Sequence, residues 1–285
     1  MILRSLKRVP DRIMVALQYR LILKRWPDLR HPSRFTEWVQ CYKVSYRNKT
    51  MLKCTDKYAV RDYVRSRIGE RYLTRMYQVC NKPEEIDFSL LPDKFIIKTT
   101  DGGNGDNIII VTDKNKLNIS DCIHKLNTWE DKRYDIISRE WAYSGMKHSQ
   151  IIIEELLEDP TSSDGSIADY KFLCFNGQFR YLWIDKDRFT NHRRGFWNQD
   201  LTFLKGTSSD YPTFEAAPEL PDNIREMIPI AEKLADGFPF ARVDLYNVNG
   251  KILFGEITFY PWSGYVQYSP DAFDFKLGQE FIDWR

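Results

Sequence analysis

Apolar residues recur at three- and four-residue spacing through the first third of the chain, from Arg12 to about Tyr77. This spacing is typical of helices that bury one face. Within this stretch, Asp56 comes directly before a run of apolar and basic residues that reaches Val64. An acid in this position is a common helix N-cap. The pattern predicts a helical N-terminal region in which one helix begins beside Asp56.

The pattern changes near Pro83, where apolar residues gather in short β-branched runs. Residues 95–98 and 107–111 read as strands on either side of a polar, glycine-rich stretch, and residues 150–157 as a buried strand that leads into a polar loop. Helical periodicity returns in residues 129–143 and 220–236. Strands and helices therefore mix without the regular alternation of a doubly wound sheet.

Two hairpins are indicated in the last third of the chain. Residues 171–174 and 178–184 flank Asn176-Gly177, and residues 241–246 and 251–259 flank Asn249-Gly250. An Asn-Gly pair between two apolar runs is a strong sign of a two-residue hairpin turn. We therefore expect an α+β fold with antiparallel sheets.

Composition narrows the function classes. The chain has 285 residues, enough for a substantial core, and 42 Lys+Arg against 40 Asp+Glu leave no basic field for nucleic acid. The five cysteines form no C-x-x-C pair, so we expect neither a zinc site nor a disulfide framework. The first 26 residues interleave basic and apolar positions too closely for a signal peptide or a spanning helix, which predicts a cytoplasmic protein. Such a helix either packs on its own domain or makes peripheral contact with the inner face of an anionic membrane.

A lysine followed by a glycine-rich turn is the first candidate site. Lys98 ends a predicted strand, and the turn after it contains Gly102, Gly103, Asn104 and Gly105. Without Cβ atoms in the way, several backbone N–H groups can converge there on phosphate oxygens. A glycine-rich turn without a ligand is the alternative, and Asp101 and Asp106 would repel phosphate unless they turn outward or meet a metal.

The strand at 150–157 and the next strand offer further contacts for a nucleotide. Glu154, Glu155 and Leu157 can present polar groups to an adenine edge and an apolar side chain to its face. Lys171, on the following strand, can meet the α-phosphate. The alternatives are a strand that ends in solvated acids and a lysine that faces solvent.

The last hairpin carries the sharpest candidate site. Period two places Arg242 and Asp244 on one face of their strand, and Glu256 and Thr258 on one face of the partner strand. Asp244 and Glu256 together would form an oxygen site for Mg²⁺. The two faces coincide only if the loop has an odd number of residues or a strand carries a bulge, because a strict two-residue turn sets Asp244 opposite Gly255. An exposed cross-strand charge surface is the alternative.

A basic loop is expected after the strand at 179–184. It contains Arg188, His192, Arg193 and Arg194, with aromatic residues following. Arginine suits carboxylates and phosphates, and aromatic rings stack on sugars, so these residues are candidate substrate contacts. A solvated basic loop is the alternative.

Taken in order along the chain, these features resemble the ATP-grasp superfamily. The series is Lys57, Lys98, Glu154 with Leu157, Lys171, Arg242, Asp244 and Glu256. Residues 56–61, 91–98, 169–172 and 255–261 are similar to the TupA-like ATP-grasp family, and the likeness covers nearly the whole chain. It implies two antiparallel-sheet α+β subdomains that sandwich ATP, at 89–165 with the glycine loop and at 166–285 with the metal-binding hairpin. A helical subdomain at 1–88 would precede them.

The resemblance also implies an activity and its participants. ATP and Mg²⁺ would serve a carbon–nitrogen ligase that activates a carboxylate as an acyl phosphate, joins it to an amino-acid amine, and releases ADP and phosphate. The carboxylate implied is a uronic acid of a bacterial capsule, O-antigen or teichuronopeptide, on a nucleotide-linked, lipid-linked or oligosaccharide carrier. Arg242 and Lys171 would be catalytic, and Asp244, Glu256 and Thr258 would hold the metal. The nucleotide would contact Lys57, Lys98, Gly102, Gly103, Asn104, Gly105, Glu154, Glu155, Leu157 and Lys171.

Two positions depart from the family pattern. Thr258 stands where many ATP-grasp enzymes carry an asparagine metal ligand. The number of Mg²⁺ ions that the site would bind, one or two, is therefore left open. The family pattern expects an acid that binds the ribose shortly after the adenine strand, but the residue at that position is Thr161. Asp159 is the nearest acid that could take this role. Two other functions use the same residues: a phosphotransferase that needs no amine, and a nucleotide-binding module without turnover.

Overall fold

The computed structural model describes residues 8–103, 107–146, 148–159, 165–187, 190–281 and 283–284. The helices are α2 (Asp11–Leu23), α3 (Phe35–Ser45), α4 (Lys49–Cys54), α5 (Val60–Arg67), α6 (Ile119–Asn127), α7 (Tyr134–Ile137), α8 (Ile224–Ala235) and α9 (Ala272–Gln279). The strands are β1 (Met76–Cys80), β2 (Phe95–Thr99), β3 (Ile108–Val111), β4 (Ile151–Glu154), β5 (Asp169–Phe175), β6 (Gln178–Lys186), β7 (Arg193–Asn198), β8 (Phe240–Val248) and β9 (Lys251–Thr258).

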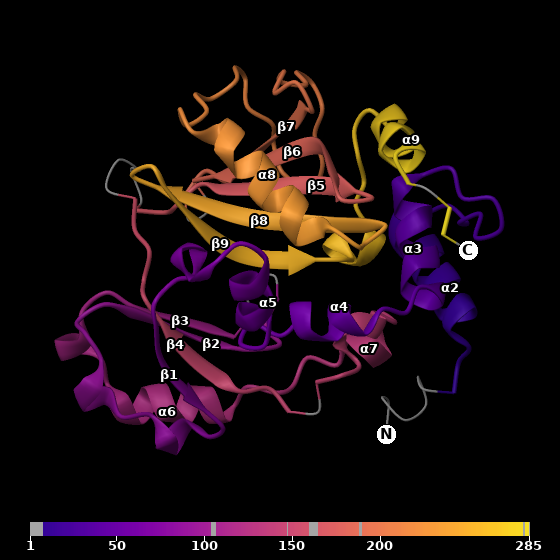
Figure 1. Ribbon diagram of the computed structural model, residues 1–285. Coiled ribbons are helices and arrows are strands. Elements are labelled where there is room, and N and C mark those ends of the chain that lie inside the picture. The colour runs from indigo at the N-terminus through magenta and orange to yellow at the C-terminus, as the bar shows by residue number, and fades with distance from the viewer. Residues whose placement is uncertain are drawn as a thin grey trace.

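The strands form two antiparallel sheets, one above the other in Figure 1. The smaller sheet has the order β1-β4-β2-β3 and the larger sheet the order β7-β6-β5-β8-β9. Helices α4 and α5 lie between the two sheets in this view, and α8 lies across the larger sheet. The expected α+β class with antiparallel sheets is therefore confirmed.

Both predicted hairpins are present. β5 and β6 meet at a two-residue turn in which Asn176 and Gly177 have φ angles of 50° and 75°. β8 and β9 meet at a similar turn, where Asn249 and Gly250 have φ angles of 52° and 79°. Two consecutive left-handed residues are what a type I′ turn requires, which explains why both turns use Asn-Gly.

A bulge in β9 sets the register that the sequence analysis required. Asp244 lies opposite Glu256, whereas the next residue, Leu245, lies opposite Phe254, so Gly255 is the extra residue. A Cβ atom on Gly255 would lie only 3.0 Å from the backbone oxygen of Asp244. Glycine therefore permits the bulge, and the bulge brings the two acids to the same face. The prediction of a bulge or an odd loop is confirmed.

The helices that the sequence predicts are present in some of the expected ranges and absent in others. Asp56 accepts hydrogen bonds from the backbone N–H groups of Tyr58 and Ala59, both at 2.8 Å, just before α5 begins. Helix α8 lies within the predicted range 220–236. The helical prediction was wrong at residues 76–77, because β1 begins at Met76 and pairs with β4. Pairing with a buried strand overrides local periodicity there.

The helix expected over 129–143 is also mostly absent. Only α7 and a 3-10 turn at Trp141–Tyr143 form within this range. Between them Arg139 has a positive φ angle of 61°, which a continuous right-handed helix excludes. Its backbone conformation therefore separates the two short turns.

The helices and sheets share two hydrophobic cores. The larger core joins α3, α4 and α5 to the five-stranded sheet and α8, so that Val39, Met51 and Val64 belong to the same cluster as Phe172 and Val243. The smaller core lies under the four-stranded sheet and includes residues of α6. The N-terminal helices therefore brace the larger sheet. None of the helices among the described residues is long and apolar enough to cross a bilayer.

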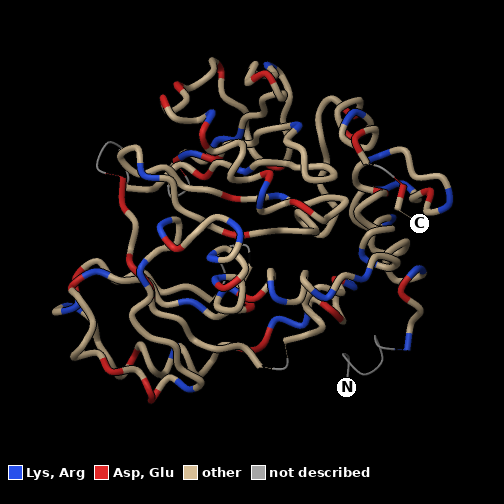
Figure 2. The backbone as a smooth tube through the Cα atoms, in the orientation of Figure 1, with Lys and Arg blue, Asp and Glu red and all other residues tan. Residues whose placement is uncertain are grey.

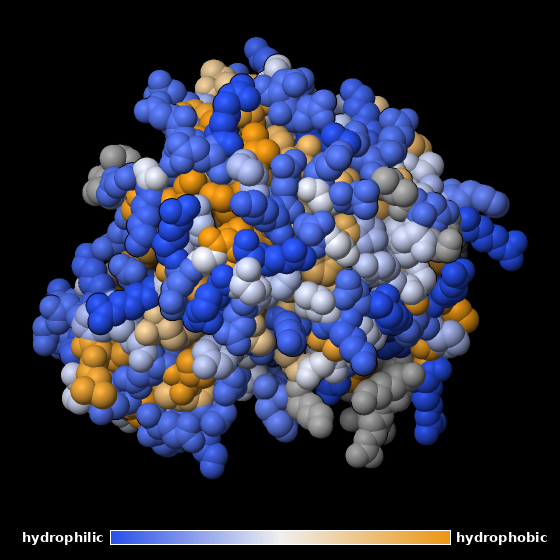
Figure 3. Space-filling model, in the orientation of Figure 1, coloured by the Kyte–Doolittle hydropathy of each residue, from blue (hydrophilic) through white to orange (hydrophobic). Residues whose placement is uncertain are grey.

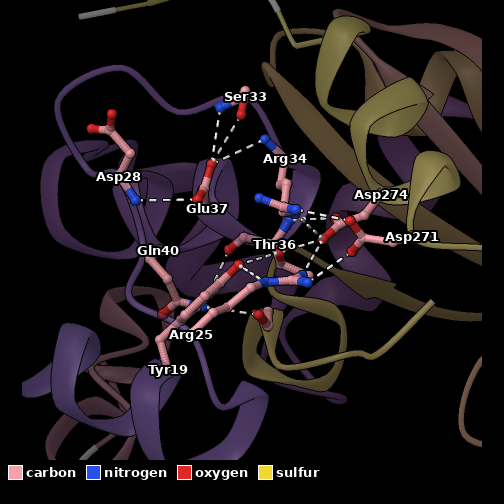
Figure 4. Close-up of polar contacts among 11 residues, drawn as sticks. Tyr19, Arg25, Asp28, Ser33, Arg34, Thr36, Glu37, Gln40, Asp271 and Asp274 are labelled. Carbon is pink, nitrogen blue, oxygen red and sulfur yellow. Dashed lines mark hydrogen bonds and ion pairs between the residues drawn. The ribbon is translucent and has the colours of Figure 1, made fainter.

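A buried polar network joins the segment before α3 to α9 (Figure 4). Asp274, which is 1% exposed, accepts hydrogen bonds from the backbone N–H and hydroxyl of Thr36 at 3.0 and 2.7 Å and from Arg25 at 2.9 Å. Arg25 and Arg34 also pair with Asp271, whose side chain is 49% exposed. Burial raises the pKa of Asp274 to about 6, so its carboxylate is ionised at neutral pH and depends on these donors.

We expect Asp274→Ala to lower the free energy of unfolding by about 3–5 kcal/mol, because it leaves Arg25 and Thr36 without their buried partner. Asp271→Ala is the matched control in the same network, and it should cost about 1 kcal/mol or less because Asp271 is half exposed. Urea unfolding of both variants measures the difference. Equal losses would show that the network stabilises the fold through its surface pairs.

Candidate functional site

Arg242 links the two strands of the last hairpin. Its Nε donates to Asp244 Oδ1 at 2.7 Å, and its Nη2 donates to Asp244 Oδ2 at 2.8 Å, to Glu256 Oε1 at 2.7 Å and to Thr258 Oγ1 at 3.1 Å. The four residues lie on one face because Arg242 pairs with Thr258 and Asp244 with Glu256 in the sheet register. The structure thus brings together all four residues that the hairpin pattern singled out.

Most of this group is withdrawn from solvent. Asp244 is 1% exposed and Arg242 7%, whereas the Glu256 side chain is 41% exposed. Burial opposes the charge of Arg242, but Asp244 and Glu256 raise its pKa above the ordinary value. For Glu256, burial raises the pKa and Arg242, Lys171 and Lys57 lower it more, to about 2. Both charges therefore persist at neutral pH.

Lys171 enters the same group from the neighbouring strand. It lies opposite Asp244 in the register of β5 and β8, and its Nζ donates to Asp244 Oδ2 at 2.6 Å and to Asp169. Burial lowers the pKa of Lys171, but Asp169 and Asp244 reverse the effect and raise it. The lysine thus faces the β8–β9 hairpin, and the alternative that the sequence left open, a lysine that faces solvent, is not what the structure shows.

Oxygen atoms that could bind a divalent cation gather around Arg242, although the described residues include no group of three or more His, Cys, Asp or Glu placed to hold a metal ion. Oxygens of Asp244, Glu256 and Thr258 converge on a single positively charged nitrogen, Arg242 Nη2. Mg²⁺ prefers oxygen ligands and binds through one or two carboxylates, substrate phosphates and water. The two carboxylates would therefore hold Mg²⁺, with the threonine hydroxyl beside them.

The four-stranded sheet contributes a second charged group. Glu154, which is 6% exposed, accepts from Lys98 at 2.8 Å, from Arg61 at 3.1 Å and from Thr74 at 3.1 Å. Burial raises the pKa of Glu154, but Lys98 and Arg61 lower it below the ordinary value. The Glu154 carboxylate is therefore occupied by protein donors, and the sequence analysis missed Arg61 as one of them.

Lys57, in the turn between α4 and α5, contacts the glycine-rich turn. Its Nζ donates to the backbone oxygen of Gly102, and its backbone N–H donates to Thr100 at 3.1 Å. Burial lowers the pKa of Lys57, while Glu256 acts in the opposite direction. This electrostatic coupling spans the two sheets, since Glu256 belongs to β9 and Gly102 follows β2.

The structure describes part of the glycine-rich turn and shows what one of its two acids, Asp101, contacts. Asp101 is 2% exposed and accepts from the backbone N–H of Lys132 at 2.6 Å, so this carboxylate has a protein donor. A Cβ atom on Gly103 would lie 3.1 Å from the Tyr134 hydroxyl, which favours glycine at this close approach. Asn104, Gly105 and Asp106 lie outside the described residues.

The predicted adenine contacts lie at the end of β4. Glu155 follows Glu154 directly, and its backbone N–H donates to Arg75 at 2.9 Å. Leu157 and Asp159 come after the strand, with the Asp159 N–H donating to Gly165 at 3.3 Å. The Glu155 amide is therefore engaged within the protein.

The basic segment after β6 is a strand and not the predicted loop from Arg193 onward. Arg193 begins β7 and donates to Thr213 at 3.0 Å. Arg194 is 2% exposed and makes a two-pronged ion pair with Asp185, at 2.7 and 3.2 Å. His192 precedes the strand, and Arg188 lies outside the described residues. The buried partner Asp185 explains why this arginine turns inward.

Sequence analysis also missed the acids beside the lysine and arginine of this sheet. Asp169 and Asp185 lie directly opposite each other in β5 and β6, and both are buried. Asp185 and Trp183 are two residues apart in β6 and therefore lie on the same face of the sheet, so the two-residue period of a strand was the available sign. Acidic and basic residues are mixed along the whole chain, as Figure 2 shows, so the sequence did not single out the acids that pair with Lys171 and Arg194.

Three solved structures illustrate what the chain is similar to. A D-alanine–D-alanine ligase from Bacillus anthracis complexed with ATP shares 17% identity, with a TM-score of 0.46 over 81% of this chain and 64% of that one. The corresponding ligase from Helicobacter pylori shares 14%, with a TM-score of 0.44 over 88% and 69%. N5-carboxyaminoimidazole synthetase from Staphylococcus aureus with ADP shares 13%, with a TM-score of 0.45 over 72% and 44%.

The chain spans about three fifths of the Bacillus anthracis ligase, 57% and 64% in two structures. No curated protein sequence matches it. A family model described as TupA-like ATPgrasp matches residues 37–282, which is most of the chain. The two antiparallel sheets agree with that match, and the chain therefore belongs to the TupA-like ATP-grasp family.

Proposed function

We propose that the protein is an ATP-dependent carboxylate–amine ligase. ATP transfers its γ-phosphoryl group to a substrate carboxylate, and an amine then displaces phosphate to form an amide. The observation that carries this proposal is the convergence of Asp244, Glu256 and Thr258 oxygens on Arg242 Nη2. One face of the hairpin, on which Arg242 and Asp244 are buried and Glu256 is partly exposed, thus offers both oxygen ligands for a metal and a cation for a transferring phosphoryl group.

The nucleotide would lie between the two sheets. Cations reach this region from both sides, Lys57 and Lys98 from the smaller sheet and its neighbouring helix, and Lys171 from the larger sheet. The remaining contacts proposed for ATP are Gly102, Gly103, Asn104, Gly105, Glu154, Glu155 and Leu157. Because Glu154 already binds Lys98 and Arg61, we assign it to orienting Lys98 in addition to meeting the adenine.

Electrostatic positioning would supply most of the catalysis. Mg²⁺, held by Asp244 and Glu256, would neutralise charge on the phosphates when bound. Arg242 stabilises the charge that develops on the acyl phosphate and on the tetrahedral oxyanion that follows. Lys171, held by Asp169 and Asp244, binds a phosphate oxygen.

For the substrates, we propose a uronic-acid carboxylate of a bacterial surface polysaccharide and the amine of an amino acid. Family membership supports this pairing, and so does the aromatic and basic character of the sheet edge at β6 and β7. There the ring of Tyr211, which is half-buried, lies 4.6 Å from the Cζ atom of the buried Arg194. An aromatic face that solvent still reaches is suited to a sugar ring.

A hydroxylamine trap tests the reaction type. With ATP, Mg²⁺ and a panel of uronic acids, uronate-bearing nucleotide sugars and amino acids, we expect hydroxamate formation together with ADP release for one carboxylate class. ADP release with a stable phosphorylated product and no hydroxamate would identify a phosphotransferase. ATP binding without ADP in any combination would identify a binding module.

Asp244→Asn should reduce turnover by about 10²–10³-fold, because it removes a preorganised charge at the transferring phosphoryl group. Arg242→Ala should cost at least about 10³-fold. Steady-state ADP release measures both effects, and circular dichroism checks folding. The control is Asp236→Asn, whose side chain is 67% exposed and pairs with Arg67 away from the hairpin. Near-normal turnover in Asp244→Asn would exclude the proposed role of the hairpin.

A further inference from the structure

A second polar cluster lies on the same sheet as the metal-site residues, toward its β7 edge. Asp185, which is 2% exposed, receives two hydrogen bonds from Arg194 and one from Trp183 Nε1 at 3.2 Å. Burial raises the pKa of Asp185, but His192 and Arg194 lower it far more, well below the ordinary value. Asp185 is therefore a fixed negative charge.

His192 is the member of this cluster that still reaches solvent. Its Nε2 lies 3.2 Å from Asp185 Oδ1, its ring stacks on Tyr211 with 3.8 Å between centroids, and its side chain is 17% exposed. The other three histidines of the chain, His31, His124 and His148, are exposed. An imidazole that lies within 3.2 Å of a buried carboxylate and is partly open to solvent is a common arrangement of a general base.

The cluster adjoins the proposed transfer site. The Trp183 ring lies 4.0 Å from the guanidinium carbon of Arg194 and 5.4 Å from that of Arg242, so one indole contacts both cations. Trp183 also lies opposite Lys171 in the register of β5 and β6. The second substrate of a ligase must bind beside the transferring phosphoryl group, and this cluster occupies such a position.

We propose that His192 is the general base that accepts a proton from the substrate amine. This inference rests on the proposed function and adds the site of the amine. The ammonium loses one proton to the imidazole, and the freed lone pair forms the C–N bond at the acyl carbon. Phosphate leaves with the C–O bonding pair and takes the second proton. Asp185 and Arg194 are positioning residues, because they act through the imidazole.

A comparison of two nucleophiles, an amino acid and hydroxylamine, distinguishes a general base at His192 from a residue that only supports the structure. Amino acids arrive as ammonium ions and need a base, whereas hydroxylamine is already neutral at neutral pH. His192→Gln should therefore lower amide formation with an amino acid by about 10²–10⁴-fold. Hydroxamate formation from the same carboxylate should change little. Asp185→Asn should show the same selectivity to a lesser extent, and His124→Gln is the matched control on an exposed histidine.

The possible outcomes distinguish failure of the His192 assignment from failure of the proposed ligase function. Loss of hydroxamate and amide together in His192→Gln would overturn the base assignment, and so would retention of both. Absence of hydroxamate from the wild-type protein with glucuronic acid, galacturonic acid and every other carboxylate of the panel would instead remove the proposed function on which it rests.

A different observation concerns the outer face of α2. Five large apolar side chains are exposed there and just beyond it: Ile13 at 52%, Leu17 at 44%, Leu21 at 67%, Ile22 at 51% and Trp26 at 63%. We call these five residues the α2 stripe. The opposite side of the helix buries Val15 and Tyr19. Figure 3 shows a mostly hydrophilic face on which apolar atoms also reach the right edge, where Figure 1 draws α2.

Basic residues surround the α2 stripe. Arg12, Arg20 and Lys24 are exposed on the same segment. The first 30 residues contain eight of the 42 Lys+Arg and only two of the 40 Asp+Glu, so the rest of the chain is net acidic. A second copy of the chain is a poor partner for this surface, because a two-fold interface would bring two basic surfaces together.

We infer that the α2 stripe docks on an anionic membrane surface. Apolar side chains would enter the boundary between headgroups and acyl chains, and the flanking basic residues would face lipid phosphates and carboxylates. A lipid-linked acceptor would then reach the enzyme at that surface. The inference does not depend on the catalytic proposal, because it rests only on exposure and charge.

Vesicle cosedimentation with the full chain tests this surface. We expect binding to phosphatidylcholine vesicles that contain phosphatidylserine, weaker binding at high salt, and little binding to phosphatidylcholine alone. The double variant Leu17→Glu/Leu21→Glu should lower the bound fraction by about tenfold or more, because two apolar side chains leave the bilayer. Leu90→Glu is the control, since Leu90 is 75% exposed but belongs to a turn before β2.

Three results would overturn the membrane assignment. They are absence of binding to anionic vesicles, equal loss of binding in Leu90→Glu, and a dimer in light scattering that Leu17→Glu/Leu21→Glu dissociates. The last would assign the α2 stripe to a second copy of the chain.

Discussion

The site depends on a guanidinium that is buried in a sheet and shared by acids from two strands. The cost of burying the Arg242 charge is offset because Asp244 and Glu256 both reach it. They do so only because Gly255 is bulged out of the pairing, since a regular ladder after the Asn-Gly turn would put Glu256 on the other face. A single extra residue thus determines whether the hairpin carries a buried ion cluster or an ordinary charged surface.

The same constraint extends across the larger sheet. Asp169 and Asp185 lie directly opposite each other, an arrangement that is unfavourable for two like charges. Lys171 binds the first acid and Arg194 the second, so each carboxylate of this repulsive pair has a cation beside it. Removing a cation would leave a buried carboxylate uncompensated, which costs far more than a surface ion pair is worth. The polar face is therefore a mutually dependent set, while the opposite face supplies the apolar surface that packs on α8.

Sequence reasoning recovered the features that depend on residues close together in the chain. The two Asn-Gly hairpins, the cap at Asp56, and the need for either an odd loop or a bulge near Asn249-Gly250 follow from turn chemistry and the two-residue period of strands, whereas the position of the bulge at Gly255 does not. It did not recover β1, whose pairing with β4 joins residues about seventy positions apart, or the contacts of Asp274 with Thr36 and Arg25. Local periodicity carries no information about such partners, because tertiary pairing determines them.

Several charges of the proposed nucleotide region are already paired within the protein. Lys98 binds Glu154, Lys171 binds Asp244, and Arg242 binds Asp244 and Glu256. A triphosphate would compete for the cations and a divalent metal for the acids. When both ligands bind, each ion pair within the protein would be replaced by one contact to phosphate and one contact to metal. Either ligand alone would leave charges of one sign without partners in a buried site, which is costly. On the proposed function, metal and nucleotide binding are therefore coupled by the same ion pairs that hold the apo sheet together.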